Sequence, residues 1–169
     1  METVPASLQD AEGIARAHVS AWQTAYRGIV SDAFLDAMSV KDRAARWRTL
    51  LEDSECSMLV ARDKDQVHGF ISFGKHREPH AKPEEGEIWT MYVHPRAWRT
   101  GVGRSLMNAS LVALELRGHM TTWVWVLAEN TQAISFYSAC GFKLQAGTKR
   151  HFTLGEQRLE EVALVRDAA

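Results

Sequence analysis

Hydrophobic positions in the first third of the chain recur every three or four residues, which is the period of an α-helix. The apolar members of a first predicted helix are Ala11, Ile14, Ala15, His18, Trp22, Ala25 and Tyr26. Ser7 can cap this helix, and Gly28 ends it. A second helical region is predicted from Ser31 to about Leu51, in two pieces broken near Ser39. With a short strand before the first helix, the N-terminal third is predicted to be mainly helical.

From residue 57 onward the pattern changes to short runs rich in β-branched and aromatic residues, which predict strands. The predicted strands are Ser57–Arg62, Val67–Phe73, Glu87–Val93, Trp123–Leu127, Phe142–Ala146 and a last one near Leu159–Arg166. The first two form a hairpin around the polar turn 63–66, and Trp123–Leu127, apolar on both faces, is expected at the centre of the sheet. Helices are predicted at Gly101–Arg117 and at about Thr131–Ala139, and Lys75–Gly86 is predicted to be a long loop.

This order of elements, β, α, α, β, β, β, α, β, α, β, β, predicts a mixed α/β (α+β) sheet with helices on both faces. A length of 169 residues with 46% hydrophobic content fits a single domain, 1–169, that can fold without a structural metal ion or disulfide bonds. Cys56 and Cys140 are too few for a disulfide framework and stand in no metal-ligand spacing. His76 and His80 are four residues apart, but Pro79 opposes the helix that would align them, so no metal site is expected.

Charge and apolar patterning exclude several classes of partner. Twenty lysines and arginines against twenty-one acidic residues leave no field that would attract nucleic acid or an anionic membrane. The longest uninterrupted apolar run, Trp123 to Ala128, is too short to span a bilayer, and the first residues show no apolar leader. We therefore expect a cytoplasmic protein without nucleic-acid or membrane partners.

The segment 93–106 carries the first candidate chemistry, because a strand ends, a turn with Gly101 and Gly103 follows, and a helix begins. A helix N-terminus presents unpaired N–H groups and a partial positive charge, and glycine keeps side chains out of the path of a phosphate. A match this short fits a structural turn equally well, so a second signal is needed. A dinucleotide-binding domain is disfavoured, because Leu106 stands where a third glycine belongs and a regular βαβ series is missing.

The second signal is the run NTQAISFYSACGF at 130–142, about thirty residues later. Together the two segments resemble the hallmarks of the GNAT acetyltransferase superfamily, Q/R-x-x-G-x-G/A after the fourth strand and N-x-x-A-x-x-F-Y-x-x-x-G-F after the fifth. Order and spacing match that family across Glu87 to Phe142. The resemblance implies a twisted, mostly antiparallel mixed sheet of about seven strands, flanked by about four helices and splayed between strands 4 and 5. It also implies an N-acetyltransferase that moves an acetyl group from acetyl-CoA directly to a primary amine.

The same resemblance implies which residues hold the cofactor. The backbone of Met91 and Val93 would pair with the pantetheine arm, and Asn130 would hold it from the other side. The remaining expected cofactor contacts are Arg99, Thr100, Gly101, Val102, Gly103, Arg104, Ala133 and Tyr137. Trp98 departs from the family pattern, because it stands where Gln or Arg is usual and cannot supply that polar group. The backbone amides of 99–104, helped by an arginine side chain, would then carry more of the pyrophosphate binding.

The reaction needs a base and an acid, because an amine attacks a thioester only when unprotonated and an alkyl amine has a pKa of about 10. Glu87 stands where similar enzymes often place a glutamate that deprotonates the substrate through water; the alternative is a solvated glutamate at a strand end. His94 and His151 are rival bases, since an imidazole titrates near pH 6.5. Tyr137 matches the tyrosine that protonates the leaving thiolate, and its alternative is an aromatic core position.

Selection of the acceptor is expected from the N-terminal helices and the 75–86 loop, where Trp22, Tyr26, His76 and His80 could line an opening. Trp22 and Tyr26 also fit a purely packing role on the apolar stripe of the first helix. The balanced charge favours a small-molecule amine as acceptor. Many members of the family pair through sheet edges or helices, so a homodimer is an open alternative to a monomer. The rival function is a non-catalytic module that binds CoA and regulates a partner.

Overall fold

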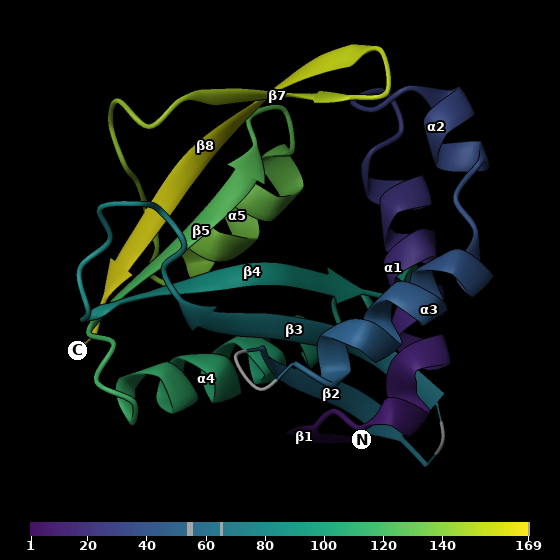
Figure 1. The fold of residues 1–169 in the computed structure, drawn as a ribbon, viewed down its shortest axis with the longest axis horizontal. Coiled ribbons are helices and arrows are strands. Elements are labelled where there is room, and N and C mark those ends of the chain that lie inside the picture. The colour runs from purple at the N-terminus through teal and green to yellow at the C-terminus, as the bar shows by residue number, and fades with distance from the viewer. Residues whose placement is uncertain (54–55, 65, 169) are drawn as a thin grey trace.

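The computed structural model describes residues 1–53, 56–64 and 66–168, and over these residues the chain forms one eight-stranded sheet with helices on both faces (Figure 1). The strands are β1 (Glu2–Pro5), β2 (Ser57–Asp63), β3 (Gln66–Lys75), β4 (Glu85–Val93), β5 (Thr121–Leu127), β6 (Lys143–Leu144), β7 (Arg150–Leu154) and β8 (Gln157–Asp167). Their order is β1-β2-β3-β4-β5-β8-β6, with β7 paired to β8. The predicted mixed sheet is confirmed, and β5 lies inside it between β4 and β8 as expected.

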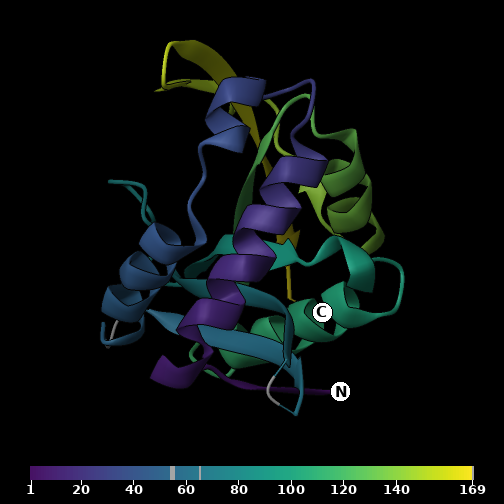
Figure 2. The same cartoon turned by 90° about the vertical axis from the view of Figure 1, so that its right-hand side faces the viewer.

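Within the described residues, five α-helices cover the sheet. They are α1 (Ala11–Ala25), α2 (Asp32–Asp36), α3 (Val40–Leu51), α4 (Val102–Glu115) and α5 (Thr131–Ala139). The expected break near Ser39 is confirmed, because the Ser39 hydroxyl accepts a hydrogen bond from the Asp42 N–H at 3.2 Å and begins α3 as its N-cap. The helices α1 and α3 lie on one face of the sheet, and α4 and α5 lie on the other (Figure 2).

Two apolar clusters hold these layers together. One joins α4 to the sheet through side chains such as Ile71, Phe73 and Leu106. The other joins α1 and α3 to the opposite face through residues such as Ile14 and Trp47. Burial on both faces fixes the sheet between its helices, and therefore fixes the ends of β4 and β5, which carry the candidate site.

The splay predicted between the fourth and fifth strands is confirmed. The parallel ladder between β4 and β5 runs only from Glu85 opposite Thr121 to Ile88 opposite Val124, after which the strands diverge (Figure 1). A bulge contributes to this separation, because Ser72 of β3 pairs with Thr90 while the next residue, Phe73, pairs with Ile88. One extra residue in β4 bends that strand. Beyond Ile88, the β4 edge that faces β5 is therefore open.

Several predicted boundaries need correction. The strand β7 was not expected, and it raises the strand number from about seven to eight. The predicted strand Phe142–Ala146 is reduced to the two residues of β6. The predicted loop Lys75–Gly86 is shorter, because β3 extends to Lys75 and β4 begins at Glu85. Residue 65 of the predicted hairpin turn lies outside the described residues.

Two absences apply to the described part of the chain. No helix there is both long enough and apolar enough to cross a membrane. No group of three or more His, Cys, Asp or Glu side chains in the same residues is arranged to hold a metal ion.

Candidate active site

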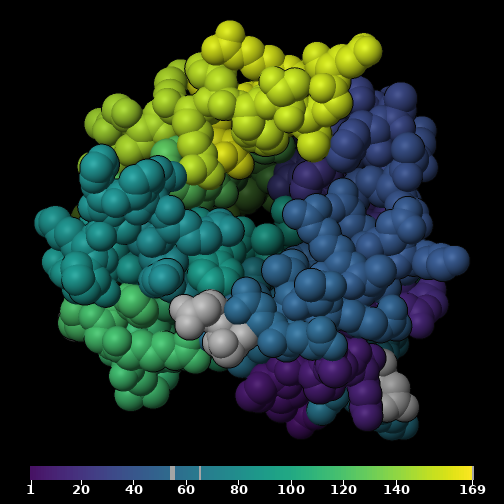
Figure 3. Space-filling model, viewed as in Figure 1, coloured from purple at the N-terminus to yellow at the C-terminus, as the bar shows by residue number. Residues whose placement is uncertain are grey.

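A cavity of about 780 Å³ occupies the gap between the splayed strands β4 and β5. Its walls include α1, the turn before α4, the start of α5 and the β7–β8 hairpin. The space-filling view shows a hollow at the centre of one face, between that hairpin, the α2–α3 segment and the β4 side (Figure 3). The cavity thus connects the helix N-termini on one side of the sheet with an opening on the other.

The turn before α4 has the geometry of an anion site. Gly101 has φ +92°, a left-handed conformation that favours glycine, and a side-chain carbon at this position would meet nothing within 4 Å. The first intrahelical hydrogen bond is donated by the Ser105 N–H to the Gly101 carbonyl at 3.0 Å, so the helical N–H groups before it have no carbonyl one turn behind them. Arg99 and Arg104 line the cavity beside this turn. Open space, free amides and two guanidinium groups fit a pyrophosphate.

Gly103 serves close packing as well as access. A side-chain carbon here would lie 3.2 Å from Met91 Cε and 3.2 Å from Phe136 Cε2, so a larger residue would require these two side chains to shift. Thr100 and Val102 do not line the cavity in the described structure. The Thr100 hydroxyl donates to the Ala97 carbonyl at 2.8 Å, and the Val102 side chain is buried in the core under α4. Any contact from these two positions must therefore come from their backbone.

Trp98, the departure from the family pattern, has a structural role at the same turn. Its indole N–H donates to the Val93 carbonyl at 2.7 Å, and its side chain lines the cavity. This hydrogen bond ties the turn to the last residue of β4. Trp98 therefore fixes the position of the loop, whereas a Gln or Arg there would offer a polar side chain.

The residues expected beside the pantetheine arm lie along the open part of the gap. Met91 and Val93 line the cavity and pair with β3 on their other side, opposite Ile71 and Gly69. Asn130 also lines the cavity, but its side-chain oxygen accepts the Ala133 N–H at 3.1 Å and caps α5. Its amide nitrogen is the part left to face a ligand.

Tyr137 is buried and lines the cavity, with its ring 5.4 Å from Phe136 and 5.7 Å from Phe142. The Tyr137 side chain is thus packed among aromatic residues and also forms part of the cavity wall. Burial raises the pKa of the Tyr137 phenol above its usual value, and the nearby Tyr92 phenol raises it further. The group therefore stays protonated at neutral pH and can donate a proton or a hydrogen bond.

Glu87 is 3% exposed and lines the cavity, so its alternative reading as a solvated strand-end residue is wrong. Arg77 bonds both carboxylate oxygens. Its backbone N–H donates to Oε2 at 3.0 Å, and its guanidinium Nη2 donates to Oε1 at 2.7 Å. A buried carboxylate needs such a partner, and these two bonds fix its orientation toward the gap.

Trp22 and Tyr26 line the cavity from α1, and their rings also pack edge to face at 4.9 Å. These two side chains therefore pack on each other and also line the cavity, and their part in acceptor selection stays a prediction. The expectation that His76 lines the opening is wrong: its ring is buried against Trp123 at 4.8 Å, with Nδ1 3.4 Å from a Glu85 oxygen. His80 is exposed and does not line the cavity.

The two rival bases also lie outside the cavity lining. His94 Nδ1 accepts the Arg96 N–H at 3.2 Å and so stabilises the turn after β4, and burial lowers its pKa. His151 is exposed on β7, with Nε2 3.2 Å from a Glu160 oxygen. Among the carboxylates and imidazoles weighed from the sequence, Glu87 is the one that reaches the cavity.

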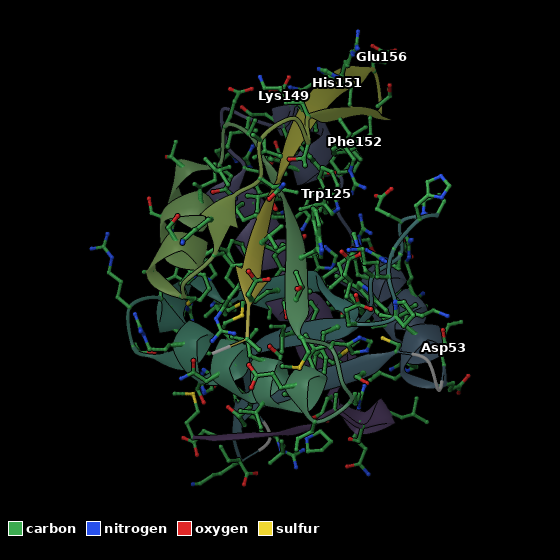
Figure 4. The ribbon with its side chains drawn as sticks, turned by 90° about the vertical axis from the view of Figure 1, so that its left-hand side faces the viewer. Asp53, Trp125, Lys149, His151, Phe152 and Glu156 are labelled. Carbon is green, nitrogen blue, oxygen red and sulfur yellow. The ribbon has the colours of Figure 1, made fainter. Side chains whose placement is uncertain are left out.

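Several lining residues were missed from the sequence. They are Arg77, Trp89, Tyr92, Trp125, Gln132, Phe136, Arg150, Phe152, Leu154, Leu159 and Glu161. Many of them lie on or beside β7, the strand that was not predicted. Figure 4 labels Trp125, which lies on β5, and Phe152, which lies on β7 of the β7–β8 hairpin. Gly155 followed by Glu156, a glycine-containing dipeptide typical of a two-residue hairpin turn, is the sequence signal that could have indicated this hairpin.

Comparison with known proteins agrees with the geometry. Residues 17–142 match the Acetyltransferase (GNAT) family. The chain is 31% identical over 160 residues to the N-acetyltransferase YuaI of Bacillus subtilis (strain 168), covering 94% of this chain and 88% of that protein. It is 32% identical over 82 residues to the ribosomal protein bS18-alanine N-acetyltransferase of Salmonella typhimurium, covering 48% and 55% respectively. The PaiA N-acetyltransferase of Thermoplasma acidophilum, solved with coenzyme A, has the same fold, with TM-score 0.78, 18% identity and 98% of both chains covered.

The fold and the family match together define an acyl-transferring enzyme built around a splayed sheet. The chain belongs to the GNAT acetyltransferase family, and acetyl-CoA is its acetyl donor.

Proposed function

We propose that this acetyltransferase moves the acetyl group directly to the primary amine of a small molecule, with Glu87 as base and Tyr137 as acid. The observation that carries the proposal is that one cavity is lined by Gly101, Glu87 and Tyr137. The groups needed for phosphate binding, deprotonation and leaving-group protonation thus share one continuous space.

The cofactor side of the cavity would be formed by the α4 turn and the open edge of β4. The amides of 101–104 and the guanidinium groups of Arg99 and Arg104 would bind the pyrophosphate. Met91 and Val93 would align the pantetheine arm along the unpaired β4 edge, with Asn130 and Ala133 opposite. When bound, acetyl-CoA supplies the thioester carbonyl carbon that the amine attacks.

Glu87 would receive the proton that the amine must lose, through a water molecule. The Arg77 bonds use one lone-pair direction on each carboxylate oxygen and leave others free for that water. Loss of that proton to Glu87 would give the neutral amine that can bond to the carbonyl carbon as the carbon–sulfur bond breaks. The buried carboxylate also attracts the substrate cation before deprotonation.

Tyr137 would donate its phenolic proton to the sulfur as the thiolate leaves. A buried thiolate without a partner is strongly basic, because burial disfavours its charge just as it disfavours the charge of the phenolate. The protonated phenol of Tyr137 provides the partner that the sulfur needs. Tyr137 regains its proton as the site re-equilibrates with solvent.

A small acceptor is favoured by the way the opening is bridged. The Arg150 guanidinium of β7 bonds Glu78 of the 76–84 segment at 2.7 Å, and so joins two walls that lie on either side of the cavity. An extended polypeptide acceptor requires an open groove, and the Arg150–Glu78 ion pair would narrow the opening of the cavity. The relative from Salmonella typhimurium acts on a ribosomal protein according to its name, so a peptide acceptor is the comparison to make.

The experiment follows release of free thiol when the purified protein is incubated with acetyl-CoA and a panel of amines, including a peptide with an N-terminal alanine. We expect turnover with one or more small amines and none above background with the peptide. Thermal stabilisation by coenzyme A is measured in parallel. Tight coenzyme binding without turnover on any amine would support the non-catalytic regulatory module instead, and preference for the peptide would refute the small-molecule acceptor.

A further inference from the structure

Two similar groups of side chains line the acceptor side of the cavity, one beside each splayed strand. Each consists of an arginine placed over a tryptophan ring and bonded to a glutamate. Beside β4 the group is Arg77, Trp89 and Glu87, and beside β5 it is Arg150, Trp125 and Glu161. The guanidinium carbon lies 5.1 Å from the ring centre in the first group and 3.8 Å in the second.

These pairs leave the acceptor side with balanced charge. Each glutamate that lines it is already bonded to an arginine, Glu87 to Arg77 at 2.7 Å and Glu161 to Arg150 at 2.9 Å. An acceptor that carries only an ammonium group would have to compete with a guanidinium for its carboxylate. The guanidinium would lose its carboxylate partner in that competition, and an ammonium group offers it nothing in exchange. A simple cationic amine is therefore a poor match.

An acceptor that carries both an ammonium group and a carboxylate can bind both members of a glutamate–arginine pair. The ammonium group can bind the carboxylate of Glu87 while a carboxylate binds the guanidinium of Arg77, so every charge stays paired. Arg77 is the available cation of the two, because its side chain is 55% exposed. Arg150 already bonds two carboxylates, those of Glu161 and Glu78.

The distance between the charges in the ligand follows from the same contact. Glu87 and Arg77 are direct neighbours, so the ammonium and carboxylate of the ligand must also be neighbours, as they are in an α-amino acid. Apolar side chains also line this part of the cavity, and three of them, Trp89, Trp125 and Phe152, are aromatic. A flat apolar side chain would bury its surface against these rings.

We infer that the acceptor is a free α-amino acid with a large aromatic side chain, bound through Glu87 and Arg77. The inference rests on the proposed function, since it assigns the substrate of that same cavity. In this arrangement the amine that is acetylated lies on Glu87, the proposed base. Arg77 selects the substrate by its carboxylate, and Trp125 with Phe152 selects it by its side chain.

The test compares L-phenylalanine, L-phenylalaninamide and phenethylamine as acceptors for the unaltered enzyme. The amide keeps the ring and the amine but loses the carboxylate, and its amine is the less basic of the two. Intrinsic reactivity at neutral pH therefore favours the amide. We expect kcat/KM for phenylalanine to exceed both others by about tenfold or more, through a lower KM. L-Alanine should be a poorer acceptor than phenylalanine.

A substitution of Arg77 tests whether this residue is responsible for the preference for a carboxylate-bearing acceptor. In Arg77→Met the preference for phenylalanine over its amide should fall toward one, mainly because KM for phenylalanine rises. Lys82→Met is the matched control, because it removes a cation from the same segment at a position outside the cavity lining, and it should keep the preference. The comparison of three amines by the unaltered enzyme does not depend on the folding of any variant.

The outcomes separate the two proposals. If phenethylamine or the amide equals or exceeds phenylalanine, acetyl transfer stands and the amino-acid acceptor is refuted. If other amines release thiol while all aromatic compounds fail, the assignment of the acceptor class is also refuted. If no amine releases thiol and coenzyme A gives no thermal stabilisation, the proposed function fails, and this inference fails with it.

Discussion

Arg77 holds Glu87 by two hydrogen bonds, from its backbone N–H at 3.0 Å and from its guanidinium at 2.7 Å, although it lies ten residues away on the segment after β3. The bonds bring a buried carboxylate and an exposed cation together at the wall of the cavity. The base proposed for the reaction thus depends on a residue that no motif includes.

Replacing Glu87 by Gln should lower kcat/KM for the amine acceptor by about 100-fold, because general base catalysis typically contributes that much or more. The amide keeps the size of the side chain and its place beside Arg77, so affinity for coenzyme A should change little. Steady-state kinetics and calorimetry measure the two quantities. Glu84→Gln, an exposed neighbour outside the cavity lining, serves as control. Equal loss in both variants would argue against a specific role for Glu87.

The Tyr137→Phe variant should lose about 100-fold in kcat while its affinity for coenzyme A stays close to that of the unaltered protein. The ring remains packed between Phe136 and Phe142, so only the hydroxyl group is removed. Single-turnover thiol release with a competent amine is the measurement. An unchanged rate would remove Tyr137 from the role of acid and leave it as a packing residue.

Gly101→Ala should weaken binding of coenzyme A and also lower the free energy of unfolding by about 1 kcal/mol, because alanine is strained at φ +92°. Gly147 offers a matched control. It has φ +78°, has nothing within 4 Å of an added carbon, and lies outside the cavity lining. Gly147→Ala should show similar destabilisation without any effect on binding. Calorimetry and denaturant unfolding distinguish strain from loss of the anion site; equal affinities in the two variants would contradict the site.

The stability of the protein should fall as the pH drops below about 6.5, in part because of His18. Burial, aided by the nearby charges of Arg43 and Arg46, lowers the pKa of His18 to about 3, and its Nδ1 accepts the Trp47 indole N–H at 3.1 Å. Between pH 6.5 and 3 the unfolded chain therefore binds a proton that the folded chain does not. The stability that the neutral, buried His18 gives the folded protein is fully present above pH 6.5. As the pH falls from 6.5 to 3, the free energy of unfolding decreases by up to about 1.4 kcal/mol per pH unit.

Urea unfolding at pH 7 and pH 5 measures this dependence for the unaltered protein and for His18→Gln. The variant should be less stable at pH 7, because His18 is buried among aromatic rings, but it should lose less stability between the two pH values. Parallel losses in both proteins would show that other groups control the pH dependence.

The sequence by itself determined the helical N-terminal third, the glycine turn at 101–103 and the position of Tyr137 before Gly141 and Phe142. These features depend on local signals: helical periodicity, the backbone conformation that glycine allows, and a motif whose residues lie within one turn and one helix. The expected splay is also confirmed, and it came from resemblance to the family.

Only the tertiary structure decided which residues line the proposed acceptor side of the cavity. Arg77 bonds Glu87 only because β3 and β4 are adjacent, and Arg150 bonds Glu78 across 72 residues of sequence. The strand β7 escaped prediction because five largely exposed residues carry little hydrophobic pattern, and it is held by pairing with β8. Charge pairs and edge strands of this kind depend on which segments the fold brings together. The local pattern of hydrophobic and polar residues does not predict which segments become neighbours, because each partner of a charge pair alone resembles an ordinary exposed polar residue.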